Sequence, residues 1–205
     1  TSGGLAEIMT VFALTDPSRG PRGVSAIVVP ADTPGIRVTK VEDKMGQRAS
    51  NTVELTFENV RVPQANLLGK RGRGFPIALN TLDFGRSGVA ALSVGVARTA
   101  LEHATAYAKE RQQFGAPIII NQGVSFMLAD MAMKVEAARL LTWQAAWLAD
   151  KGARATGKSA MAKCFASDAA MDVTTCAVQI LGGNGYMRDY PVEKMMRDSK
   201  LLQIY

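Results

Sequence analysis

Three short polar runs interrupt an otherwise apolar sequence and could carry chemistry. Residues 83–86 place an acid and an arginine one helical turn apart. Residues 110–115 place Arg111 at an expected helix end, just before Gly115. Residues 179–186 contain a cluster of glycines, which exposes backbone N–H groups and lets a large ligand approach. Each run also has a purely structural explanation: a surface ion pair, a cation at the negative end of a helix dipole, and a glycine helix cap.

Composition excludes several classes of protein. The chain has 205 residues, 47% of them hydrophobic, and 24 Lys plus Arg against 18 Asp plus Glu, which gives a net charge of +6. A disordered chain would be poorer in apolar residues, so a folded core is expected. The positive charge is spread along the chain without a Lys/Arg block, so no nucleic-acid partner is predicted. Attraction to anionic small molecules is the most that the charge indicates.

The sequence predicts no His-clustered metal site, no disulfide and no membrane-spanning segment. His103 is the only histidine, which excludes His-clustered metal sites and triads that need an imidazole. Cys164 and Cys176 lie in one expected helix, about 18 Å apart along its axis, so they cannot bridge and a reducing compartment is expected. No apolar run is long enough to span a membrane. The sequence begins at Thr1 without a leader-like segment, and it is expected to be a fragment or a processed piece.

Residues 1–74 are expected to form the C-terminal part of an antiparallel β-domain. Short β-branched runs alternate there with turn residues, and the expected strands are Met9–Leu14, Val24–Val29, Ile36–Val41 and Val53–Phe57. They predict a meander or small barrel. Four strands are too few to close a barrel, so the remaining strands are expected outside this chain.

Residues 75–205 are expected to form an up-and-down four-helix bundle, which makes the fold class α+β. Apolar spacing changes to three and four residues, with helices expected at 76–110, 121–151, 156–181 and 191–202. Two apolar stripes are predicted to face the core. They are Val124, Met127, Met131, Val135 and Ala138, and Met161, Phe165, Val173, Cys176 and Ile180. Trp143 and Trp147 are interpreted as core or packing residues.

The third run and the residues after it resemble in full the C-terminal signature of the acyl-CoA dehydrogenase family. The matching residues are Gln179, Gly182, Gly183, Gly185, Tyr186, Asp189, Lys194 and Asp198. Four more stretches are similar to that family at the expected places. They are residues 45–48, 57–63, 111–115 and 127–132. The resemblance covers the entire chain but only about the second half of a family member.

The resemblance implies a flavoprotein that oxidises an acyl-CoA thioester to trans-2-enoyl-CoA, in fatty-acid or amino-acid catabolism. In that family a carboxylate removes the α proton while a hydride passes from Cβ to FAD, and an electron-transferring flavoprotein takes the electrons. The base is expected immediately after Tyr205, outside the chain. Some relatives carry it before the arginine matching Arg86, where this chain has Gly85. No catalytic residue is therefore predicted within the chain, and the fragment alone is expected to be inactive.

The resemblance also implies ligand residues. Those expected to contact FAD, several of them across a subunit interface, are Thr1, Arg111, Phe114, Gln122, Gln179, Gly182 and Gly183. Asp83 and Arg86 are expected to hold the CoA portion of the substrate. Because the FAD contacts cross subunits, a homodimer or homotetramer is expected. That assembly gives the Met and aromatic faces of the bundle a second use, as an oligomer interface, which the sequence does not separate from core.

Two alternatives stay open. One is an acyl-CoA oxidase-type flavoenzyme, and the other is a catalytically silent helical assembly module that needs only the bundle. The expected compartment is the bacterial cytoplasm or the mitochondrial matrix.

Overall fold

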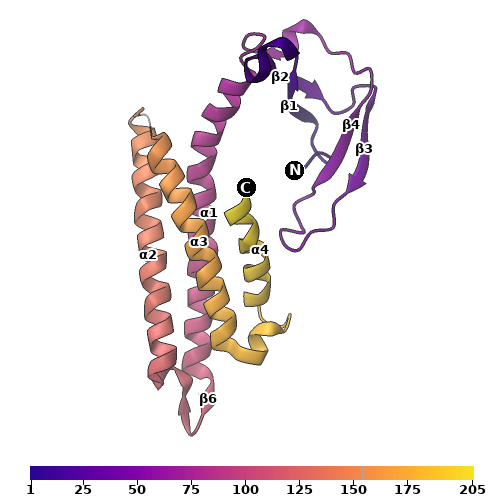
Figure 1. The fold of residues 1–205 in the computed structure, drawn as a ribbon. Coiled ribbons are helices and arrows are strands. Elements are labelled where there is room, and N and C mark those ends of the chain that lie inside the picture. Colours follow the sequence, from indigo (N-terminus) through magenta and orange to yellow (C-terminus); the bar gives the residue numbers. More distant parts are fainter. Residues whose placement is uncertain (154) are drawn as a thin grey trace. The chain divides into compact units, whose positions relative to one another are not determined.

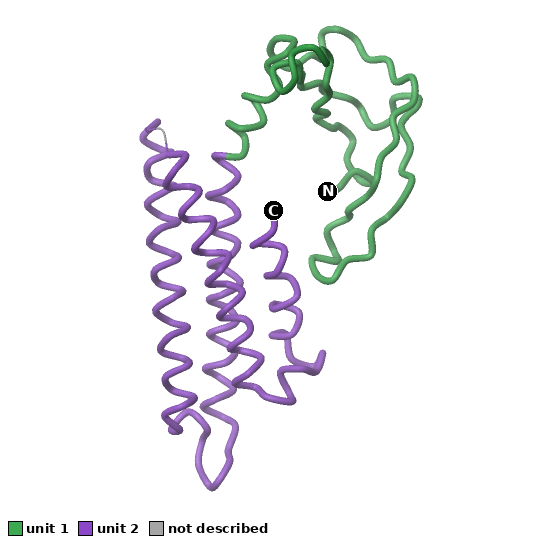
Figure 2. Tube along the Cα trace, in the orientation of Figure 1, with its two compact units in different colours: residues 1–82 green, residues 83–205 purple. Residues whose placement is uncertain are grey.

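The chain folds into two compact units. The computed structural model describes residues 1–153 and 155–205, which divide into unit 1, Thr1–Leu82, and unit 2, Asp83–Tyr205 (Figures 1 and 2). The first long helix, α1 (Gly74–Glu110), begins where the sequence changes from strand to helix periodicity, but its first residues belong to unit 1. The mixed α+β class is confirmed.

Unit 1 contains two small antiparallel sheets (Figure 1). All four expected strands are present: β1 (Ile8–Leu14), β2 (Val24–Pro30), β3 (Ile36–Val41) and β4 (Val53–Phe57). They form two separate sheets: β2 pairs with both β1 and the short β5 (Leu67–Leu68), while β3 pairs with β4. The sequence did not predict β5, since two residues are too few to show a period.

Unit 2 is an up-and-down helical bundle (Figure 1). After α1 come α2 (Gln122–Asp150), α3 (Thr156–Leu181) and α4 (Val192–Ile204), within two residues of the expected ranges. α2 packs on α3, and α3 packs on α4. A short hairpin between α1 and α2, made by β6 (Gln112–Gln113) and β7 (Ala116–Pro117), was not predicted.

Small residues build much of the centre of the bundle. One buried cluster consists of alanines from three helices, and it lies where α2 packs on α3. Its members are Ala90 of α1, Ala138 and Ala145 of α2, and Ala162, Ala166 and Ala169 of α3. Met131 and Val135 of α2 are buried in a second cluster with residues of α1, α3 and α4, so the first predicted stripe is confirmed.

Four predicted core residues are exposed instead. Met161 is 58% exposed and Phe165 40%, so the second stripe is wrong at its first turns, where the alanines of α3 face inward. Trp143 and Trp147, predicted as core or packing residues, are 62% and 59% exposed. In that stretch α2 buries small residues on another face, which leaves both indoles outside.

Candidate functional site

Two of the predicted polar runs meet at one end of the bundle. A cavity of about 390 Å³ opens between the end of α1 and the end of α3. Its lining combines both runs with residues that sequence reasoning missed. The lining residues are Tyr107, Arg111, Gln113, Ile118, Ile180, Leu181, Gly183 and Asn184. Segments far apart in the sequence therefore share one site.

A glycine turn forms one wall of this cavity. α3 stops at Gly182, whose φ of 59° and ψ of −133° lie in a region that residues with a Cβ rarely adopt. The chain then makes a 3-10 turn, Gly182–Tyr186. A Cβ added at Gly183 would meet no atom within 4 Å. The turn is thus open at the position that lines the cavity.

Arg111 supplies the charge of the site. Its backbone continues from α1, donating to Tyr107 O at 2.8 Å and accepting from Ile118 N at 2.8 Å, so the backbone at this position is fixed. Its side chain is exposed and, within the described part of the chain, has no carboxylate within 4 Å. The guanidinium group of Arg111 is planar and offers several N–H donors, and it shares the cavity with the open glycine turn. This arrangement fits the phosphates of a dinucleotide, and so fits the FAD that the resemblance implies.

A side-chain network that the sequence did not reveal supports the glycine turn. Asn184 Nδ2 donates to the hydroxyl of Tyr107 at 2.8 Å. The ring of Tyr107 meets that of Tyr190 edge-on, with centroids 5.8 Å apart and an interplanar angle of 89°. α1 therefore holds the turn in place through a contact between residues 77 positions apart in sequence.

Of the other predicted FAD residues of unit 2, Gly183 lines this cavity, whereas Phe114, Gln122, Gln179 and Gly182 do not. Phe114 sits at the tip of the β6–β7 hairpin, fully exposed, with a φ of 53° that is uncommon for a large side chain. Gln122 is the exposed first residue of α2, and Gln179 is exposed on the last turn of α3, just before Gly182. An outward aromatic in a strained turn is suited to a contact outside its own chain.

Thr1 belongs to unit 1 and is exposed there. It lines a separate cavity of about 410 Å³ together with residues of β1 and β4. The structure thus describes its surroundings only within unit 1, and its expected contact with the flavin stays a prediction.

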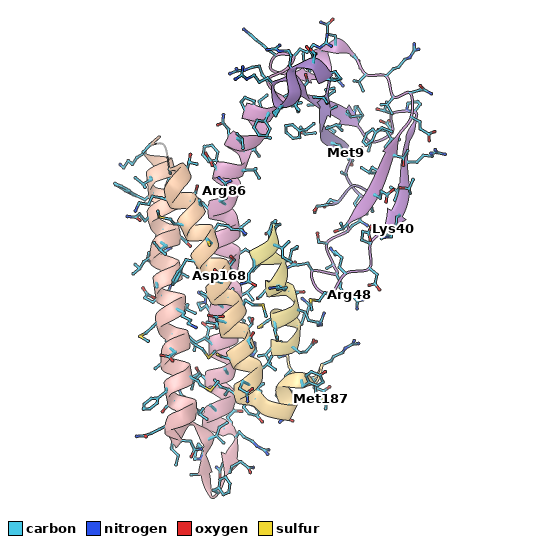
Figure 3. All side chains as sticks on the ribbon, in the orientation of Figure 1. Met9, Lys40, Arg48, Arg86, Asp168 and Met187 are labelled. Atoms are coloured by element: carbon cyan, nitrogen blue, oxygen red, sulfur yellow. The ribbon has the colours of Figure 1, made fainter. Side chains whose placement is uncertain are left out.

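Asp83 and Arg86 form the ion pair that their spacing predicts. The Nη1 of Arg86 lies 2.6 Å from Oδ1 of Asp83, and both side chains are half-buried. Arg86 projects from α1 (Figure 3). Thr156, at the start of α3, donates to the second carboxylate oxygen at 2.6 Å. Both oxygens of the acid are therefore engaged, and Arg86 is left in a fixed orientation with donors to spare.

Ion pairs also stabilise α4, the helix that precedes the expected position of the catalytic base. Glu193 in its first turn accepts from Arg197 at 2.7 and 2.9 Å. That hydrogen bond lowers the pKa of Glu193, against the smaller opposing effect of burial. Lys194 pairs with the mostly buried Asp198.

Contacts from α3 fix the end of α4. Gln203 Nε2 donates to Asp168 at 2.7 Å, and Asp168 projects from the middle of α3 (Figure 3). Lys163 donates to the Gln203 carbonyl at 3.4 Å and lies 5.9 Å from the ring centre of Tyr205. The backbone that precedes the expected base therefore has a defined path.

The described residues offer no metal site. No group of three His, Cys, Asp or Glu side chains in residues 1–153 and 155–205 could hold a metal ion. In those same ranges no helix is both long and apolar enough to cross a membrane. His103 is exposed on α1, and both cysteines are free thiols on α3.

Comparison with known proteins gives a consistent result. Residues 1–60 match the acyl-CoA dehydrogenase middle domain, and residues 72–205 match the acyl-CoA dehydrogenase C-terminal domain. The chain is 55% identical over its whole length to an acyl-CoA dehydrogenase of Bacillus subtilis, of which it covers 54%. It thus spans about half the length of the curated relatives it matches.

Solved structures agree with the sequence relatives. The butyryl-CoA dehydrogenase of Megasphaera elsdenii superposes with a TM-score of 0.98 at 52% identity, over 100% of this chain and 54% of that one. A structure described with the electron-transferring flavoprotein of Acidaminococcus fermentans superposes with a TM-score of 0.98 at 54% identity, over 100% of this chain and 54% of that one. With both segments of the chain matched in order and the fold reproduced throughout, this chain belongs to the acyl-CoA dehydrogenase family.

Proposed function

We propose that the protein containing this chain is an FAD-dependent acyl-CoA dehydrogenase that converts an acyl-CoA to the trans-2-enoyl-CoA. One observation carries the proposal: Arg111, which has no carboxylate partner among the described residues, and the open turn at Gly183 line one cavity. That combination suits a large anionic ligand, which a silent assembly module would not require. FAD, when bound, supplies the acceptor for the hydride that leaves Cβ.

Arg111, Phe114, Gln122, Gln179, Gly182 and Gly183 would contact FAD, together with Thr1 from unit 1. The exposure of Phe114 and Arg111 supports a flavin held mainly by another subunit, because neither side chain is covered by its own chain. A homodimer or homotetramer is accordingly part of the proposal.

Asp83 and Arg86 would hold the CoA portion of the substrate. Thr156 and Asp83 fix Arg86, so its remaining donors can meet phosphate without losing side-chain freedom on binding. The carboxylate that removes the α proton would follow Tyr205, at the end of a helix whose path Asp168 and Lys163 define. An electron-transferring flavoprotein would take the electrons, in the bacterial cytoplasm or the mitochondrial matrix.

The FAD assignment is tested by Arg111→Ala in the full-length protein. The variant should lose FAD on gel filtration while its helix content, by circular dichroism, stays unchanged. Lys109→Ala is the matched control, because it removes an exposed cation from the same helix end without touching the cavity. Unchanged flavin occupancy in Arg111→Ala would overturn the assignment and leave only the helix-dipole explanation.

The reaction itself is tested by anaerobic mixing with acyl-CoA thioesters. Bleaching of the flavin absorbance supports dehydrogenation, and its absence with every thioester contradicts it. Subsequent mixing with air separates the two enzyme classes, since rapid reoxidation of the flavin would indicate an oxidase.

A further inference from the structure

Gln203, in the last turn of α4, is held through both its side chain and its backbone. Its Nε2 donates to Asp168 Oδ1 at 2.7 Å, and its backbone oxygen accepts from Lys163 Nζ at 3.4 Å. Lys200, one turn earlier in α4, donates to Gln203 Oε1 at 2.9 Å. These three contacts are called here the Gln203 clamp. Two of them come from α3, so the clamp ties the last turn of α4 to the helix on which it packs.

The neighbours of Gln203 are held to different degrees. Leu202 is fully buried among residues of the bundle core. Ile204 and Tyr205 are 71% and 55% exposed. The ammonium of Lys163 lies 5.9 Å from the ring centre of Tyr205, at the outer limit of a cation–π contact. Leu202 and the Gln203 clamp are therefore the firm contacts nearest to the expected position of the base.

The contact between Asp168 and Gln203 is directional. Among the described residues, no Lys or Arg lies within 4 Å of the Asp168 carboxylate. Its other oxygen faces the sulfur of Cys164 at 4.0 Å, and a thiol is only a weak donor. The Gln203 amide is thus the strongest partner of this acid, and a hydrogen bond from an amide fixes orientation more closely than an exposed ion pair does. Asp168 is suited to orienting α4.

A shift at Gln203 would reach the residue after Tyr205. Only three residues separate the two positions, which corresponds to about one turn of helix. In the proposed reaction the carboxylate at that position must meet the hydrogen on the α carbon of the substrate. Misplacement of a reacting group by about 1 Å can cost about a hundredfold in rate. A small displacement of the last turn of α4 would therefore slow proton removal.

We propose that Asp168 and Lys163 are positioning residues for removal of the α proton, acting through Gln203 on the carboxylate expected after Tyr205. The inference rests on the proposed function. Both residues lie outside the cavity that Arg111 lines. Their loss should therefore slow the chemical step and leave the affinity for substrate nearly unchanged.

The test measures flavin reduction in the full-length holoprotein, by anaerobic stopped flow, over a range of acyl-CoA concentrations. Asp168→Ala and Lys163→Met should each lower the limiting rate about tenfold, while the half-saturating concentration changes by no more than about twofold. Asp168→Asn should keep most of the rate, because its amide oxygen can accept the same hydrogen bond. Asp172→Ala is the matched control, since it removes another exposed acid of α3 whose partner is Lys134 of α2.

An acyl-CoA deuterated at the α carbon provides a readout that a loss of stability would not change. The isotope effect on flavin reduction should be larger in Asp168→Ala than in the wild type, because removal of the α proton then limits the rate more strongly. Circular dichroism and the flavin absorbance check that each variant is folded and carries FAD. Alanine at position 168 is favourable within a helix, so Asp168→Ala is expected to fold.

Wild-type limiting rates in both Asp168→Ala and Lys163→Met, or an equal loss in Asp172→Ala, would overturn the positioning role. A higher half-saturating concentration at an unchanged limiting rate would also overturn it, because that result indicates lost substrate binding. Failure of the proposed function gives a different result, since no thioester would then reduce the wild-type flavin. Hydrogen exchange tests the clamp whether or not reduction occurs: the last amides of α4 should exchange faster in Asp168→Ala, and unchanged exchange would contradict the clamp.

Discussion

At the scale of single residues, the contact between Asn184 and Tyr107 is the one that positions the glycine turn. Both side chains line the cavity with Arg111, yet neither carries the charge expected to bind a ligand. Their hydrogen bond joins α1 to the turn after α3. Loss of either partner should let the turn move relative to Arg111.

A double-mutant cycle of Asn184→Ala and Tyr107→Phe tests this role. Each single variant should weaken FAD binding and lower the free energy of unfolding by about 1 kcal/mol, because one part-buried hydrogen bond is lost. The double variant should be little worse than either single one. Fluorescence titration measures the FAD affinity, and urea unfolding measures the free energy of unfolding. Additive losses would mean that the two side chains act independently.

The sequence predicts the site residues that lie in distinctive motifs, but not the residues that hold them in position. Arg111 and Gly183 lie in motifs whose composition stands out, and the structure places both on one cavity. Tyr107 and Thr156 are an ordinary helix tyrosine and an ordinary helix-start threonine in the sequence. Their roles depend on contacts made 77 and 73 residues away, which no local pattern encodes.

At the scale of elements, a glycine inside a helix and a glycine at a helix end have opposite effects on stability. Gly85 lies within α1, where an added Cβ would meet no atom within 4 Å and the backbone has no positive φ. Gly182 ends α3 with a φ of 59°, which a side chain with a Cβ disfavours. The backbone of α1 therefore does not need its glycine at this position, whereas the end of α3 does.

Substituting alanine at both positions tests that contrast. Gly85→Ala should raise the free energy of unfolding by about 0.5–1 kcal/mol, because alanine loses less backbone freedom in a helix. Gly182→Ala should lower it by about 1 kcal/mol, because a Cβ disfavours the backbone conformation there. Urea unfolding followed by circular dichroism measures both changes. If both substitutions changed the free energy of unfolding equally and in the same direction, the placement of Gly85 inside a helix and of Gly182 at a helix end would be contradicted.

The ion pair at the start of α4 should make its stability depend on pH. The hydrogen bond from Arg197 lowers the pKa of Glu193 from its ordinary 4.5. The stabilisation is therefore complete above 4.5 and is lost as the pH falls through the lower, folded-state value. Glu193→Gln should cost about 0.5–1 kcal/mol near neutral pH.

Urea unfolding of wild type and Glu193→Gln over a descending pH series measures that dependence. The difference between the two proteins should shrink in acid, once the carboxylate of the wild type is protonated in both states. A difference that stays constant with pH would show that Glu193 contributes through packing rather than through its charge.

Helix ends and strands were predictable to different degrees. All four helices lie within two residues of expectation, because glycine and proline mark their ends and apolar spacing persists over many turns. β5 and the β6–β7 hairpin have two residues per strand and show no period. The apolar spacing predicts Phe165 in the core, but the packing of α2 on α3 favours alanine at the buried positions.

At the scale of the whole molecule, α2 presents an apolar face that its own chain leaves uncovered. Five large side chains lie on it, at spacings of seven, seven, three and four residues. They are Phe126, Met133, Leu140, Trp143 and Trp147. Trp143 also borders a groove of about 590 Å³ between α1 and α2. An exposed apolar stripe of this extent is typical of an interface, which fits the proposed homo-oligomer.

Lysine substitutions on this face should therefore weaken self-association. Met133→Lys and Trp143→Lys should each raise the subunit dissociation constant about tenfold or more, because a charge would be buried without a partner. Sedimentation velocity over a range of protein concentrations measures the shift toward smaller species. Thr175→Lys is the control, since Thr175 is also exposed but lies on α3, away from the apolar stripe of α2. If all three variants sediment as the wild type does, the stripe is not the contact between subunits, and the cross-subunit position of Arg111 needs another interface.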